Sequence, residues 1–185
     1  MRMILRNTVL GVLGLVMSVC LTGAAELPAP LLAVKPEMRL VGSARMRVWG
    51  LHIYDISLYS AETPYTTNST AVLTLHYNVS IKRDRLLETT LEEWDRLGIV
   101  DSPQRREWIG RLAMLWPDVR PGDTLTALRR GNGSTDCYQG DRMVGEVKDP
   151  AFGPAFFAIW LDANCSHPKS RESLLGMKTD KKNRK

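Results

Sequence analysis

The sequence predicts an α+β fold in which helices pack mostly on one face of an antiparallel β-sheet. Three observations predict it. β-Branched and aromatic residues alternate with polar ones over 38–59 and 70–79, as in strands with one buried face. From residue 82 the apolar residues recur every three or four positions, as in helices. Later strand-like runs are joined by tight turns and not by helical crossovers, which indicates antiparallel neighbours.

Two helices are predicted after these first strands. One covers 82–98, where leucines recur at helical spacing and Gly98 stands at the position of a C-cap. The other begins after Asp101 or Ser102, since either residue can cap it, and Pro103 lies in its first turn. Both helices have an apolar side, so both are expected to pack on the sheet.

The second half of the chain predicts a β-meander followed by two more helices. Three short strand-like runs lie within 118–147, and turn sequences separate them at 121–122, 131–133 and 140–141. A helix that is apolar nearly all round is predicted over 149–162, and a short last helix ends at Gly176. Strands, helices, strands and helices in this order fit one α+β domain.

The first 25 residues are predicted to be a secretory signal peptide. Arg2 and Arg6 precede an uncharged apolar run over 9–21, and the small residues 23–25 follow it. This run is shorter than the roughly 20 residues that span a bilayer. A lipoprotein anchored through Cys20 and an uncleaved anchor are the alternatives.

The remaining chain is predicted to form one domain (38–176), preceded by an N-terminal linker (26–37) and followed by a basic disordered tail (177–185). The net charge of +5 arises largely in the tail, because residues 178–185 hold five basic side chains and one acidic one. The domain itself is nearly neutral and lacks the basic surface of nucleic-acid-binding proteins, so no nucleic-acid partner is expected. No second apolar run is long enough to be a transmembrane segment.

Cysteines and histidines show no pattern of metal ligation. Cys137 and Cys165 remain after signal cleavage, and the sequence leaves open whether they form a disulfide or stay free. His52, His76 and His167 lie far apart and lack the spacing of metal ligands. No metal ion or other cofactor is expected.

The stretch RMRVWGLHIYDISLY, residues 45–59, places polar side chains among large apolar ones. If Trp49-Gly50 is a two-residue hairpin turn, one face of the hairpin carries Arg45, Arg47, His52 and Tyr54, and the other carries Met46, Val48, Leu51 and Ile53. A longer turn or a bulge would shift the register by one residue and split the polar group. The group is therefore either the solvated back of the sheet or the lining of a pocket.

Several segments of the chain resemble the chalcone isomerase-like family, in particular its small bacterial secreted members. They are LVGSARMRVWGLHIYDISLYS (40–60), EEWDRLG (92–98), WPDVRPGDTLTAL (116–128), GEVKDPAFGPAFFAIWLD (145–162) and SLLG (173–176). The resemblance implies an open-faced β-sandwich, with a long antiparallel sheet, helices over one face and a cleft between the two layers. It also implies a bacterial protein that is periplasmic or secreted.

The resemblance suggests a binding site in that cleft. Plant chalcone isomerases use an arginine and a threonine to hold the substrate ketone, and the arginine stabilises the enolate. Arg45 or Arg47 matches this arginine, whereas Tyr54 stands in place of the threonine, which puts isomerase activity in doubt. Plant fatty-acid-binding members keep an arginine and a tyrosine for a carboxylate, and this chain is closer to that arrangement.

The predicted function is therefore non-catalytic binding of a fatty acid or a similar amphipathic carboxylate. The predicted ligand-binding residues are Arg45, Arg47, Tyr54 and His52, and no catalytic residue is assigned. Two alternatives stay open. One is an isomerase that adds a phenolate to an enone of a polyphenol-like substrate. The other is an envelope protein that binds a protein partner and has a vestigial cleft.

Overall fold

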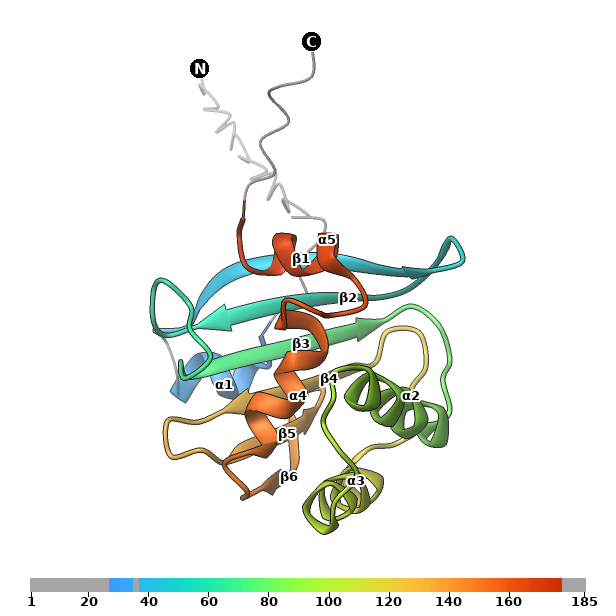
Figure 1. Cartoon of the computed structure of the whole chain (residues 1–185). Coiled ribbons are helices and arrows are strands. Elements are labelled where there is room, and N and C mark those ends of the chain that lie inside the picture. Colours follow the sequence, from blue (N-terminus) through green and yellow to red (C-terminus); the bar gives the residue numbers. More distant parts are fainter. Residues whose placement is uncertain (1–26, 35–36, 178–185) are drawn as a thin grey trace, which may run out of the picture.

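The computed structural model describes residues 27–34 and 37–177, and its centre is a six-stranded antiparallel sheet (Figure 1). The strands are neighbours in chain order: β1 (Arg39–Val48), β2 (Leu51–Ser60), β3 (Ala71–Tyr77), β4 (Thr124–Arg129), β5 (Thr135–Gln139) and β6 (Arg142–Val147). Short connections explain this meander, since hairpins join β1 to β2, β4 to β5 and β5 to β6. The predicted α+β class is confirmed. The signal peptide predicted over 1–25 lies outside the described residues and stays a prediction, as does most of the predicted tail.

Three helices cover one face of the sheet: α2 (Arg83–Arg96), α3 (Pro103–Leu115) and α4 (Phe152–Leu161) (Figure 1). A fourth, α5 (Pro168–Leu174), packs against β1. The local start and stop signals act as predicted. The Ser102 hydroxyl accepts a hydrogen bond from the Arg105 amide at 3.1 Å and so caps α3, and Gly98 follows α2 with a positive φ of 72°.

An aromatic cluster joins these helices. Trp94 of α2 and Phe152 of α4 are fully buried, and their ring centroids lie 6.5 Å apart in an edge-to-face arrangement. Trp108 of α3 completes the group at 5.7 Å from Trp94 and 5.9 Å from Phe152. The indole N–H of Trp94 donates to the carbonyl of Ala155 at 3.0 Å. The buried rings are thus hydrogen-bonded as well as packed, which fixes α2, α3 and α4 as one layer.

A short helix, α1 (Ala29–Val34), covers the opposite face of the sheet (Figure 1). Leu27 and Leu31, four residues apart, are buried there against Val72 and Leu128. The prediction of a linker over 26–37 is therefore wrong for this stretch. A six-residue helix has too few turns to show an apolar period in the sequence, and only the sheet beneath it makes the two leucines a core.

The hairpin between β1 and β2 turns at Trp49 and Gly50, as one of the two predicted registers requires. Both residues have positive φ, 54° and 82°, and Val48 pairs with Leu51. This is the backbone of a two-residue turn whose twist matches that of the strands. The tight turn is confirmed, although a large side chain stands at a position where glycine, asparagine or aspartate is usual.

A β-bulge interrupts the ladder just beyond the turn. Arg47 pairs with His52 as predicted, but Met46 pairs with Tyr54, which leaves Ile53 as an extra residue on β2. Of the two alternatives that the sequence left open, the one in which a bulge splits the polar group is therefore the one observed, and Tyr54 does not share a face with the arginines. The extra residue turns Tyr54 to the side of Met46, which is the side of the helices.

Candidate functional site

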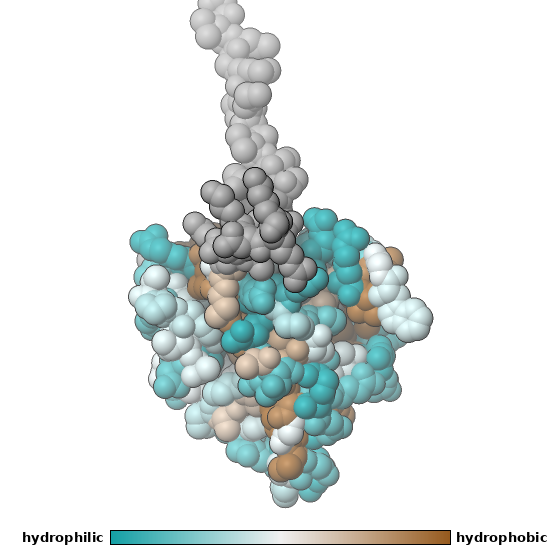
Figure 2. Space-filling model, turned by 45° about the horizontal axis from the view of Figure 1, so that its top comes forward, coloured by the Kyte–Doolittle hydropathy of each residue, from teal (hydrophilic) through white to brown (hydrophobic). Residues whose placement is uncertain are grey.

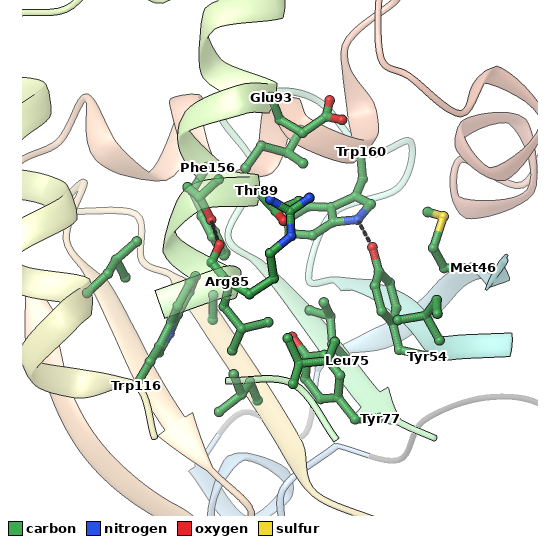
Figure 3. Close-up of a pocket in the computed structure, with 18 of the residues that line it drawn as sticks. Met46, Tyr54, Leu75, Tyr77, Arg85, Thr89, Glu93, Trp116, Phe156 and Trp160 are labelled. Carbon is green, nitrogen blue, oxygen red and sulfur yellow. Dashed lines mark hydrogen bonds between the residues drawn. The ribbon is translucent and has the colours of Figure 1, made fainter. Parts of the chain in front are cut away.

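A cavity of about 460 Å³ lies between the sheet and the helices α2, α3 and α4 (Figure 3). This volume falls within the range of roughly 300–1,000 Å³ that is usual for ligand pockets. Strands β2 to β5 supply the floor, with Tyr54, Leu75, Tyr77, Leu125, Ala127 and Cys137. The helices supply the opposite wall, with Leu86, Thr90, Leu112, Phe152, Phe156 and Trp160. Most of these side chains are apolar and buried, so the cavity can hold an apolar group out of water.

The mouth of the cavity is mostly polar, and Val48 is its apolar part. Its exposed lining residues are Val48, Ser80, Arg85, Thr89, Ser166 and His167. Glu93 also lines this part, and its carboxylate is paired with Arg96, whose Nη2 lies 2.5 Å and Nε 3.0 Å from Oε2. Arg96 thus neutralises the charge of Glu93. In the described part of the chain, Arg85 is the cationic residue that lines the mouth.

Arg85 was missed by the sequence reasoning. It lies in the first turn of α2, its side chain extends over the cavity in Figure 3, and its Nη1 is 2.9 Å from Glu92 Oε1 and 3.2 Å from Glu88 Oε2. Exposed ion pairs contribute only about 0–1 kcal/mol, so this guanidinium can change partner at little cost. One signal was present. KRDR at 82–85 places basic residues at a helix N-terminus, where the helix dipole disfavours them.

Of the four predicted ligand-binding residues, Tyr54 alone has a side chain that lines the cavity. Its hydroxyl accepts a hydrogen bond from the Trp160 indole N–H at 2.9 Å, drawn as a dashed line in Figure 3. Burial raises the pKa of Tyr54 to about 12. The hydroxyl therefore keeps its proton at physiological pH and can donate a hydrogen bond to an acceptor in the cavity.

Arg45, Arg47 and His52 lie on the other face of the hairpin. Arg45 is exposed and its Nε is 3.4 Å from Asp55 Oδ1, while His52 Nε2 is 3.1 Å from the same oxygen. Arg47 is exposed as well and its Nη1 lies 3.5 Å from the carbonyl of Gly50. The bulge thus separates the predicted group. Tyr54 lines the cavity, whereas Arg45 and His52 contact Asp55 on the other face and Arg47 lies beside the turn.

Cys137 and Cys165 are both free thiols, so the disulfide that the sequence left open does not form. Cys137 lies on β5 in the cavity floor, whereas Cys165 lies in the connection after α4. Burial raises the pKa of Cys137 to about 12. The thiol is therefore protonated near neutral pH and acts as a small apolar part of the cavity wall.

Within residues 27–34 and 37–177, no cluster of three or more histidine, cysteine, aspartate or glutamate side chains is arranged to hold a metal ion. His76, for example, meets the Thr124 hydroxyl through Nδ1 at 3.3 Å. In the same part of the chain, every helix is too short or too polar to be a membrane-spanning segment.

The fold and the site define a class: an open-faced α+β sandwich with an apolar cavity between its layers and a polar mouth. The chain belongs to the chalcone isomerase-like family, whose sequence profile matches residues 22–176. The predicted family is therefore confirmed. Among solved structures, the chain is similar to the crystal structure of the Arabidopsis thaliana fatty-acid binding protein AtFAP1, with a TM-score of 0.61 and 12% identity. That match covers 76% of this chain and 87% of AtFAP1, and at this identity it shows the shared fold. No curated protein sequence matches the chain.

Proposed function

We propose that this protein binds an amphipathic carboxylate such as a long-chain fatty acid, with the acyl chain in the cavity and the carboxylate at the mouth beside Arg85. The observation that carries the proposal is the cavity itself, about 460 Å³ with apolar walls and a guanidinium at its opening. The likeness of the fold to AtFAP1, a fatty-acid binding protein, supports it. The predicted bacterial periplasmic or secreted location is compatible with this proposal and stays part of it.

The energetics favour an acyl chain over a purely polar ligand. Each methylene moved from water into an apolar wall contributes about 0.8 kcal/mol, so ten of them contribute roughly 8 kcal/mol. That is the free energy of a complex of about 1 μM, before the cost of ordering the ligand. Tyr54 adds a hydroxyl donor on the cavity wall, where a polar group of the ligand can pair with it.

The arrangement favours binding over the isomerase alternative. Stabilising an enolate requires a cation held against the reacting oxygen in a site that excludes water. Arg45 and Arg47, the arginines matched to the isomerase residue, lie on the face away from the cavity. Of the described residues that line the cavity, Arg85 is the only arginine, and it stands at the exposed mouth.

Closing the mouth should abolish binding. Thr89→Trp places an indole at the opening, and we expect it to weaken oleate binding at least tenfold. Delipidated protein is titrated with oleate and the affinity is read by calorimetry. Thr67→Trp makes the same change at an exposed threonine that does not line this cavity, and it should bind like the unmodified protein. Failure of the unmodified protein to bind oleate, or equal affinity in the Thr89→Trp variant, would contradict the proposal.

The carboxylate contact is tested separately. Arg85→Ala should weaken oleate binding by up to about fivefold, because an exposed ion pair contributes about 0–1 kcal/mol, and it should leave binding of the uncharged oleyl alcohol unchanged. Arg47→Ala is the matched control, since this arginine faces away from the cavity. A loss of oleate affinity in Arg47→Ala but not in Arg85→Ala would place the carboxylate on the other face and refute the assignment.

A further inference from the structure

The tip of the β1–β2 hairpin exposes a large apolar group that folding does not explain. The side chain of Trp49 is fully exposed, and its neighbours Leu51 and Val48 are 59% and 44% exposed. Trp49 also has a positive φ of 54°, a conformation that costs a residue with a Cβ about 1–2 kcal/mol. A glycine or an asparagine would form this turn more easily and would not place an indole in water.

The hairpin tip, defined here as Val48, Trp49 and Leu51, lies at the end of two long strands. Figure 1 shows the turn projecting past the neighbouring strands at the upper right of the molecule. In Figure 2, apolar surface lies at the right-hand edge, the side to which the hairpin projects. The tip is therefore convex and exposed to solvent on several sides, so its apolar side chains can insert into an apolar environment outside the protein.

The tip is continuous with the cavity. Val48 belongs to both, since it is exposed at the hairpin end and lines the cavity mouth. Met46, Ile53 and Tyr54 follow it along the two strands and line the cavity further in. An apolar path therefore leads from the hairpin tip into the cavity, along which an acyl chain could move without crossing bulk water.

The basic side chains beside the tip favour an anionic surface. Arg45 and Arg47 are exposed on the outer side of the same hairpin, and Asp55 offsets one of the two charges. A basic side chain near an anionic bilayer contributes about 1 kcal/mol. Tryptophan is enriched where lipid head groups meet the acyl region, because its ring is amphipathic.

We propose that the hairpin tip docks this protein on an anionic phospholipid bilayer, with Trp49 and Leu51 at the acyl boundary and Arg47 among the head groups. Docking brings the cavity mouth to the lipid surface. Transfer of a ligand between bilayer and cavity rests on the proposed function, whereas docking itself does not. The tip is too small for a stable protein interface, which buries about 800 Å² on each partner, so the bilayer is the occupant that it fits.

Cosedimentation with vesicles tests the proposal. The protein is incubated with vesicles of phosphatidylcholine and phosphatidylglycerol in equal parts, or of phosphatidylcholine alone. We expect binding to the anionic vesicles that weakens as salt is raised, and at least a tenfold loss of binding in Trp49→Ser. Met114→Ser, which removes a 71% exposed side chain from α3, is the matched control and should sediment like the unmodified protein. The basic residues 178–185 are present in all variants, so a difference between them reports the hairpin.

Two results would overturn the docking proposal: unmodified protein that fails to sediment with anionic vesicles, or Trp49→Ser that sediments as well as the unmodified protein. A tip that served a protein partner would give the first result. Oleate binding in solution separates this proposal from the proposed function, because Trp49 does not line the cavity and Trp49→Ser should keep full affinity. Loss of vesicle binding with retained oleate binding supports the docking role alone.

Discussion

Replacing Phe152 by alanine is expected to lower the free energy of unfolding by about 3–5 kcal/mol, the largest effect of any single change considered. Phe152 is fully buried at the start of α4, and its ring lies 5.9 Å from that of Trp108 and stacks on Phe156 at 5.5 Å. The loss combines the transfer free energy of the ring with the cost of a void that the rigid neighbours cannot fill.

Urea denaturation of the Phe152→Ala variant measures this loss. Met114→Ala is the control, because it shortens an apolar side chain that is 71% exposed and should change stability by less than about 0.5 kcal/mol. A loss below about 1 kcal/mol in Phe152→Ala would show that α4 does not pack against α2 and α3 through this ring. The cavity wall would then also be wrongly placed, since Phe152 is part of it.

Gly42→Ala is expected to destabilise the protein by about 2–3 kcal/mol, whereas the same change at Gly110 should stabilise it by about 0.5–1 kcal/mol. A Cβ on Gly42 would lie 2.1 Å from the carbonyl oxygen of Ser173 and 2.7 Å from that of Leu174. Both oxygens belong to the backbone of the last two residues of α5, which are held in place by the rest of the helix. Only movement of the whole helix away from β1 therefore relieves the clash.

Gly110 is the matched control because it lies in the interior of α3, is exposed and has no atom within 4 Å of an added Cβ. Alanine there lowers the conformational entropy of the unfolded chain and improves helix propensity. Thermal unfolding of the two variants side by side gives the comparison. Equal midpoints for the two variants would mean that α5 does not pack on β1 at Gly42.

The elements of this fold were predictable because their signals are local. The apolar period over 82–98 and Gly98 at its end predicted α2, and Ser102 with Pro103 predicted the start of α3. A cap or a tight turn depends on a few residues that are adjacent in the chain, so the sequence alone contains what decides it. The turn at Trp49 and Gly50 is of the same kind.

The direction in which Tyr54 points was not predictable, because strand alternation reads the same with or without one extra residue. The register is decided by a distant partner. Tyr54 lines the cavity with its hydroxyl hydrogen-bonded because Trp160, 106 residues later, donates to it, whereas Asp55 and the arginines lie on the other face. Neither partner can be identified from the local sequence.

The candidate site follows the same division. That the chain has a sheet, helices and a family resemblance to binding proteins could be read from the sequence, since period, caps and motifs are properties of short segments. The cavity, its cation Arg85 and the role of Leu31 in covering the sheet depend on which elements meet in space. The sequence by itself determined the type and order of the elements. Only the tertiary structure decided which face each side chain occupies, because burial against residues far along the chain outweighs the small local cost of a bulge.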